Sequence, residues 1–183
     1  MAEEKKKKKG LRPHLNDYVQ DVNGEYIYKG THHVCTLPAD VFRGQSKLLL
    51  TVFILAFALL IASGCLSTGT TSGAFYVTVP YAVAVVLTFI CIYDSVTVFR
   101  SGGKLRTHDH DRVIPRAKGC AVVGAAFAAA AAVGQGVYLI FFGEAATRGA
   151  DILYLLCVLL AAALDFAAFR RQRIIRWNLQ QIV

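Results

Sequence analysis

Charged residues are scarce in this chain, since Asp, Glu, Lys and Arg together make up only 17% of its 183 residues. Soluble domains are roughly one quarter charged, so the composition argues against an ordinary soluble domain. Hydrophobic residues make up 55% of the sequence, and they are gathered into a few long blocks. These blocks indicate one membrane domain that uses most of the chain.

Motifs that mark catalytic or cofactor sites are also lacking. The sequence has no phosphate-binding glycine loop, no H-E-x-x-H and no G-x-S-x-G. Its five cysteines stand singly, without C-x-x-C or any other metal-like spacing. We therefore expect a protein that is not an enzyme and that needs no cofactor, with its cysteines acting as small buried hydrophobes.

Four apolar segments have the length of membrane spans. Residues 48–66 and 119–142 are uncharged runs, and a hydrocarbon core needs about 20 helical residues. Residues 75–99 and 152–169 each contain one Asp, and their length and flanks assign them as spans that return the chain to its basic side. The sequence predicts an all-α membrane protein with four transmembrane helices, arranged as two tandem helical hairpins.

Basic residues lie almost entirely on one side of these spans. Nineteen of the 20 Lys and Arg residues fall within residues 1–47, 100–118 and 170–183, and the remaining one is Arg148. Basic residues in short loops resist translocation, so these three segments and both chain ends are predicted to be cytoplasmic. We expect a multi-pass protein of the plasma membrane, with short outer loops typical of the bacterial inner membrane.

One alternative concerns residues 59–65, LLIASGC, which are similar to the end of a bacterial lipoprotein signal with Cys65 as the lipidated residue. Against it, 47 residues precede the apolar run, and the basic region of a signal peptide is much shorter. We therefore interpret this run as a transmembrane span.

Two carboxylates, Asp94 and Asp165, lie inside predicted spans, where an ionised side chain is costly and needs a partner or a task. Each follows by 47 residues a lysine that precedes a span, Lys47 for Asp94 and Lys118 for Asp165. This matched register indicates an old duplication, or only a shared need to mark membrane edges. We predict two Lys–Asp pairs, which either staple helices together or form a proton or cation relay open to the cytoplasm.

The span at residues 119–142 is built largely from small residues. Small side chains let helix backbones approach closely in lipid, where no hydrophobic force drives helices together. We predict that this span is the central packing helix, with Ala129, Ala130 and Gly134 at its contacts.

The N-terminal region has two predicted parts. Residues 1–16 are basic, and we expect them to be disordered and attracted to anionic lipid. Residues 17–47 contain two short strand-like segments around Asn23 and Gly24, a sequence that favours a β-hairpin, followed by a pre-membrane helix. The hairpin is either a lid over the cytoplasmic face or a docking element.

The C-terminal segment, residues 170–183, is predicted to be a basic amphipathic helix on the membrane surface. Ile175, Leu179 and Ile182 recur at the spacing of one helical face, and Trp177 is available as an interfacial anchor.

Two histidine clusters are weak candidates for a metal site: His108 and His110 in the second cytoplasmic segment, and His32 and His33 near Cys35. An H-x-H pair in a charged loop lacks the ligand spacing of known tetrahedral zinc sites. The sequence therefore predicts a solvated loop and no metal.

We interpret the chain as a small polytopic membrane protein that serves as a non-enzymatic structural or accessory subunit. The alternative is a small oligomeric transporter or ion-coupled carrier that uses Asp94 and Asp165. The expected partners are the lipid bilayer, including anionic inner-leaflet lipid, and another membrane protein or a second copy of the chain. Nucleic acid is not expected, because the basic residues border apolar spans.

Overall fold

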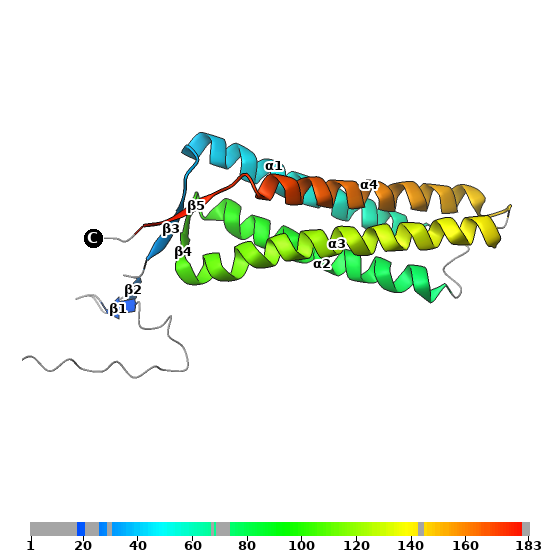
Figure 1. Ribbon diagram of the computed structural model, residues 1–183, viewed down its shortest axis with the longest axis horizontal. Helices are drawn as coiled ribbons and strands as arrows, with labels where there is room; N and C mark the ends of the chain where they lie inside the picture. The colour runs from blue at the N-terminus through cyan, green and yellow to red at the C-terminus, as the bar shows by residue number, and fades with distance from the viewer. Residues whose placement is uncertain are drawn as a thin grey trace, which may run out of the picture.

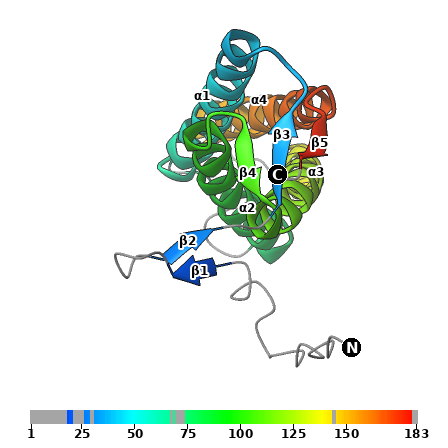
Figure 2. The same cartoon turned by 90° about the vertical axis from the view of Figure 1, so that its left-hand side faces the viewer.

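Four long helices lie side by side in the computed structural model, which describes residues 18–20, 26–28, 31–66, 68, 74–142 and 145–180 (Figure 1). In chain order they are α1 (Ala39–Gly64), α2 (Phe75–Arg100), α3 (Thr107–Phe141) and α4 (Arg148–Gln172). Both α1 and α3 pack against α2 and α4, so the four helices form a closed bundle, seen end on in Figure 2.

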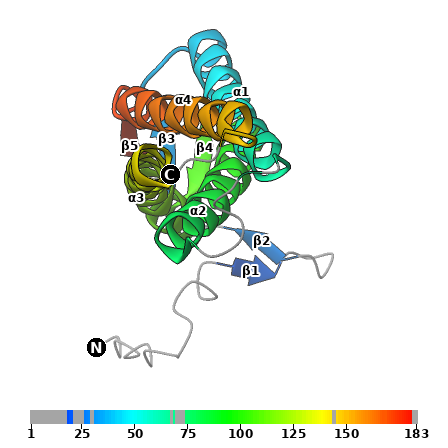
Figure 3. The same cartoon turned by 90° about the vertical axis from the view of Figure 1, so that its right-hand side faces the viewer.

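The helices alternate in direction along the bundle. The chain enters α1 and α3 at the end that carries three β-strands, and it enters α2 and α4 at the opposite end (Figures 1 and 3). We call these the sheet end and the loop end. The shortest helix has 25 residues and spans about 37 Å, more than the roughly 30 Å of a bilayer's hydrocarbon core.

All four helices are long and apolar enough to cross a membrane, in agreement with the four predicted spans. Large apolar side chains such as Phe89, Val133 and Ile140 are exposed on the outside of the bundle. An apolar outer surface is a liability in water and suits contact with lipid. The chain therefore has the architecture of a multi-pass membrane protein.

The helical packing depends on small residues of α3 and α4. The fully buried residues include Ala128 and Ala131 on α3 and Val158 and Ala161 on α4, which belong to one core cluster in the half of the bundle nearer the loop end. A second cluster, around Phe42 and residues of all four helices, fills the half nearer the sheet end.

The predicted contact positions on α3 are wrong in part. Ala129 and Ala130 are exposed, whereas Ala128 and Ala131 on either side of them are buried. A run of consecutive alanines covers every face of a helix, so composition alone does not say which alanines face a neighbour. Gly134 does lie at a contact, since a Cβ atom there would be 3.1 Å from Val77 Cγ2 on α2.

A three-stranded antiparallel sheet closes the sheet end, with β3 (His32–Cys35) between β4 (Lys104–Arg106) and β5 (Trp177–Gln180). Its strands come from the segment before α1, the α2–α3 connection and the segment after α4. The tight turn into β4 uses Gly102 and Gly103, whose φ values of 60° and 91° are costly for other residues. Three segments far apart in sequence thus meet at one end of the bundle.

The predicted surface helix at residues 170–183 is wrong in the part that the structure describes. The fourth helix ends at Gln172, a turn follows at Arg173, and Trp177–Gln180 form strand β5. The apolar spacing that resembles a helical face instead places Ile175 in the core and Leu179 opposite His33 of β3. Pairing with a distant strand overrides the local pattern here.

The N-terminal hairpin strands are confirmed. Strand β1 (Tyr18–Gln20) pairs antiparallel with β2 (Tyr26–Tyr28), with Val19 opposite Ile27. The Asn23 and Gly24 turn and residues 1–16 lie outside the described residues. The pre-membrane helix is not a separate element, because α1 runs without a break from Ala39 into the span.

Candidate intramembrane polar site

A buried ion pair joins α2 to α3 near the sheet end. Asp94 on α2 is fully buried, and Arg116 on α3 donates from Nε to its Oδ2 at 3.0 Å and from Nη2 to its Oδ1. The Arg116 side chain remains 33% exposed, so it reaches from the surface of the bundle onto a carboxylate inside. Two parallel charge-assisted bonds are the strongest arrangement for an Arg and a carboxylate.

The predicted lysine pairs are therefore wrong. Asp94 pairs with Arg116 and not with Lys47, which is exposed on α1. Asp165 is bonded to a threonine and not to Lys118. Lysines at a helix end extend toward water, and each carboxylate instead bonds to a polar group that another helix presents at its level.

The second carboxylate lies deeper. Thr88 Oγ1 donates to Asp165 Oδ2 at 2.9 Å, which joins α2 to α4. The same hydroxyl lies 2.9 Å from the carbonyl of Ala84, and its single proton is shared between the two acceptors. Asp165 Oδ1 is buried and has no hydrogen-bond partner among the described residues. Gly124 on α3 faces this pair, and a Cβ there would be 3.8 Å from Asp165 Oδ2.

A third polar contact joins α3 to α4 near the loop end. Gln135 Nε2 donates to Asp151 Oδ1 at 3.1 Å, and both side chains are fully buried. The Tyr81 hydroxyl donates to the carbonyl of Leu60, which joins α2 to α1, and its ring lies 5.6 Å from that of Tyr154. Polar contacts thus link α2 to α3, α2 to α4 and α3 to α4.

These contacts lie at three levels along the bundle. Asp94 and Thr88 precede the end of α2 by six and twelve residues, or about 9 and 18 Å, so Thr88 lies near the middle of that 26-residue helix. Gln135 lies eleven residues beyond Gly124 on α3, about 16 Å farther toward the loop end. The side chains that fill the interior between these two levels are apolar and include Ala128, Ala131 and Val158. An apolar layer therefore separates the middle level from the outer one.

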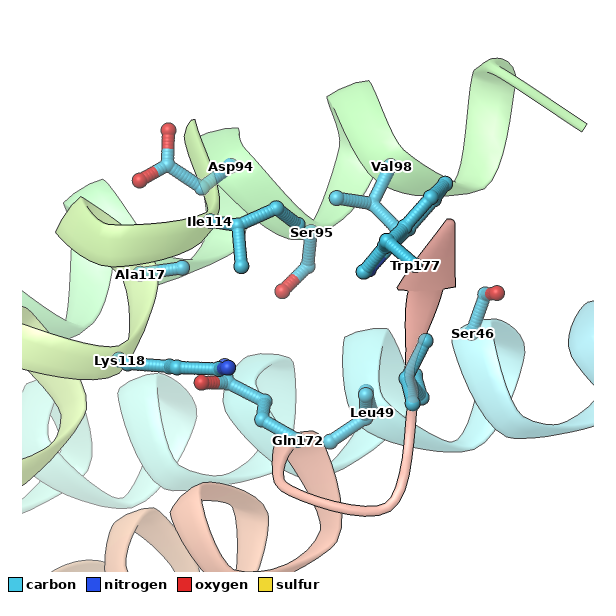
Figure 4. Close-up of a pocket in the computed structure, with 11 residues that line it drawn as sticks. Ser46, Leu49, Asp94, Ser95, Val98, Ile114, Ala117, Lys118, Gln172 and Trp177 are labelled. Carbon is cyan, nitrogen blue, oxygen red and sulfur yellow. The ribbon is translucent and has the colours of Figure 1, made fainter. Parts of the chain in front are cut away.

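A small cavity opens beside the ion pair at the sheet end (Figure 4). It has a volume of about 40 Å³ and is lined from all four helices and by Trp177 of β5. Lys118 and Gln172 point toward one another across it, while Asp94 forms part of the wall. A space of this size holds roughly one to three water molecules.

The histidine candidates separate in the structure. His108 is exposed, whereas the ring of His110 stacks on His33 of β3, with centroids 3.8 Å apart and planes at 9°. His110 also lies in the first turn of α3, which begins twelve residues before the predicted span. Arg116 and Thr88 are not among the residues predicted from the sequence, whereas His33 is one of the weak metal candidates named above.

A sequence signal for Arg116 does exist. Thr107 with Asp109 close behind it is typical of a helix N-terminus. A helix begun there places Arg116 more than two turns inside α3, at the level of Asp94, and not in a loop.

No protein-family model matches the chain, and neither does any curated protein or solved structure in the comparisons. Its function is therefore inferred from the fold and from the polar contacts described above.

Proposed function

We propose that this chain is a small integral membrane protein with a non-enzymatic structural or accessory role in the plasma membrane. In this proposal the sheet end faces the cytoplasm, because the three basic segments of the chain lead into β3, β4 and β5. The basic sheet end then lies beside anionic headgroups of the inner leaflet. The functional partner is another membrane protein or a second copy of the chain.

The observation that carries this proposal is the closed Asp94–Arg116 pair. Both carboxylate oxygens of Asp94 are bonded to the guanidinium, so the charge of this carboxylate is already paired within the protein. The adjoining cavity of about 40 Å³ is far below the roughly 300–1,000 Å³ of a typical small-molecule site. These features favour a staple between helices over a substrate site.

The second candidate is an ion-coupled carrier, and one observation favours it. Asp165 is buried near the middle of the bundle with one oxygen free of hydrogen bonds among the described residues. A carboxylate of this kind is a candidate for proton or cation binding. Against it, the apolar layer formed by Ala128, Ala131 and Val158 interrupts any path from Asp165 to the loop end.

Orientation is tested with reporters placed at residue 1, at residue 183 and at Thr71. We expect both termini to report the cytoplasm and Thr71 to report the outside. The inverse result at Thr71 contradicts the assignment of the sheet end to the cytoplasm.

Flux in liposomes separates the two candidate functions. We expect the reconstituted protein to conduct protons and monovalent cations no faster than empty liposomes, and Asp165→Asn to leave that baseline unchanged. The carrier role replaces the structural role if the wild type shows saturable flux and Asp165→Asn abolishes it. The variant must also melt at the wild-type temperature for this conclusion. Gln172→Ala, a change at the cavity and away from Asp165, is the matched control.

A further inference from the structure

Three potential metal ligands meet at the sheet end, outside the helical bundle. They are His33 of β3 and His110 and Asp111 of the first turn of α3, and each offers one ligand atom within 4.8 Å of the other two. The strand and the helix are 77 residues apart in sequence at these positions, so only the folded sheet end brings the set together.

The two histidines are already held in place. The His33 and His110 rings stack in parallel, and Trp177 of β5 packs edge-on against His110 with ring centroids 5.8 Å apart. His110 Nδ1 lies 3.1 Å from Asp111 Oδ1. The His33 Nδ1 atom is buried and has no hydrogen-bond partner within the described part of the chain. A buried nitrogen in this state calls for a ligand or an ion.

The cluster is also open to solvent on one side. The His110 side chain is 18% exposed and that of Asp111 is 67% exposed, so an ion can reach the set past Asp111.

We infer that His33, His110 and Asp111 form a binding site for a divalent transition metal ion of the Zn²⁺ class at the sheet end. Two imidazoles and one carboxylate select such ions over Mg²⁺ and Ca²⁺, which prefer oxygen ligands. Ligands of one Zn²⁺ ion lie roughly 3.4 Å apart, since Zn²⁺ bonds to nitrogen and oxygen are about 2.0–2.2 Å long. The ligand atoms lie within 4.8 Å of one another, so metal binding requires the side chains to rotate and the two rings to leave their parallel stack.

Metal binding at this site would fasten β3 to the start of α3. Trp177, which packs on His110, also lines the cavity beside Lys118 and Gln172. The bound ion therefore stabilises the sheet end and fixes one wall of that cavity. Three protein ligands leave a coordination position for water or for a group from a partner.

The test uses the full-length chain in detergent, purified with a tag that contains no histidine and stripped of metal with a chelator. Zn²⁺ is titrated by calorimetry, Co²⁺ by its visible absorption, and thermal unfolding is followed with and without Zn²⁺. We expect one ion per chain, a rise in Tm with Zn²⁺ and no rise with millimolar Mg²⁺.

The variants His33→Ala and Asp111→Asn should each weaken Zn²⁺ binding by about tenfold or more. Loss of a group that only hydrogen-bonds to a metal ligand already weakens binding by about that much. Asp111 is largely exposed, so its variant folds even where a change at His33 does not. His108→Ala, a change in the same turn of α3, is the matched control and should bind like wild type. Absence of Zn²⁺ binding in the wild type, or an equal loss in His108→Ala, overturns the site.

Discussion

The two carboxylates within the predicted spans occupy matching positions in the sequence, but their surroundings in the structure differ. Asp94 and Asp165 each lie six residues before an arginine near the end of a helix. Yet Asp94 receives two bonds from a guanidinium, and Asp165 receives one shared bond from a threonine hydroxyl. Matched spacing along two helices does not produce matched partners.

The difference comes from the neighbouring helices. Asp94 faces α3 at the level of Arg116, which reaches in from a surface where its charge stays hydrated. Asp165 accepts a hydrogen bond from Thr88 and lies beside Gly124, which has no side chain, and no described cation forms an ion pair with it. We expect the free energy of unfolding to fall strongly when one partner of the Asp94–Arg116 pair is removed. We expect it to fall less when the bond between Asp165 and its uncharged threonine partner is changed.

The largest effect is expected for Arg116→Met, which leaves the fully buried Asp94 without its cation. Breaking a buried pair by removing one partner costs about 3–5 kcal/mol in the free energy of unfolding. The measurement is chemical denaturation of the protein in detergent.

Two further variants check the cause of that loss. Arg112→Met changes an exposed arginine one turn earlier on α3 and should stay within about 0.5 kcal/mol of wild type. The double variant Arg116→Met with Asp94→Leu should recover much of the lost stability, because it removes both charges. If the double variant is no better than the single one, Arg116 contributes through packing and not through its charge.

The next effect tests whether α3 meets its neighbours on the face that carries these contacts. Ala128→Leu adds a branched side chain at a fully buried position and should destabilise by about 1–3 kcal/mol. Ala129→Leu and Ala130→Leu, at exposed positions, should change stability by less than about 0.5 kcal/mol. A larger loss of stability at Ala129 or Ala130 than at Ala128 would mean that α3 is rotated about its axis relative to this structure. The polar contacts assigned to α3 would then be wrong.

The four spans could be predicted from the sequence because run length and hydrophobicity report directly on membrane crossing. The partners of Asp94 and Asp165 could not, since pairing across a bundle depends on the rotation of each helix about its axis. The long alanine run of α3 hides that rotation, as the exposed Ala129 beside the buried Ala128 shows. Arg116 lies among charged residues that the sequence assigns to a loop, so it was not predicted as a partner within the bundle.

The sheet end illustrates a second limit. Strands β3, β4 and β5 are three or four residues long and pair only with segments distant in the chain. No local pattern specifies such a pairing, whereas β1 and β2 are close in sequence and their predicted pairing is confirmed. The His33–His110 contact depends on that same distant pairing. The sequence therefore offers both histidine clusters as weak metal candidates but does not show that these two side chains meet.

A smaller effect is expected for Thr88→Val, which keeps the shape of the side chain and removes the bond to Asp165. The carboxylate then has no hydrogen bond from the described residues, and an unsatisfied buried group costs about 1–3 kcal/mol. Thr97→Val, on the same helix with a hydroxyl bonded to the carbonyl of Tyr93 near the surface, is the control and should be nearly neutral. Equal losses in both variants would mean that the bond to Asp165 contributes nothing of its own.

The smallest effect is expected for Asp165→Asn, and it sets the two carboxylates directly against each other. An Asn amide donates to Thr88 Oγ1 and leaves the threonine proton to the carbonyl of Ala84, so the local hydrogen bonds are kept. We expect a change within about 1 kcal/mol. Asp94→Asn removes the charge that holds Arg116 and should cost about 1.5–3 kcal/mol, the contribution of hydrogen bonds to a charged group. Parallel denaturation curves of the two variants decide the matter: equal losses would show that Asp165 is held by a charged partner after all, and the contrast between the two sites would fail.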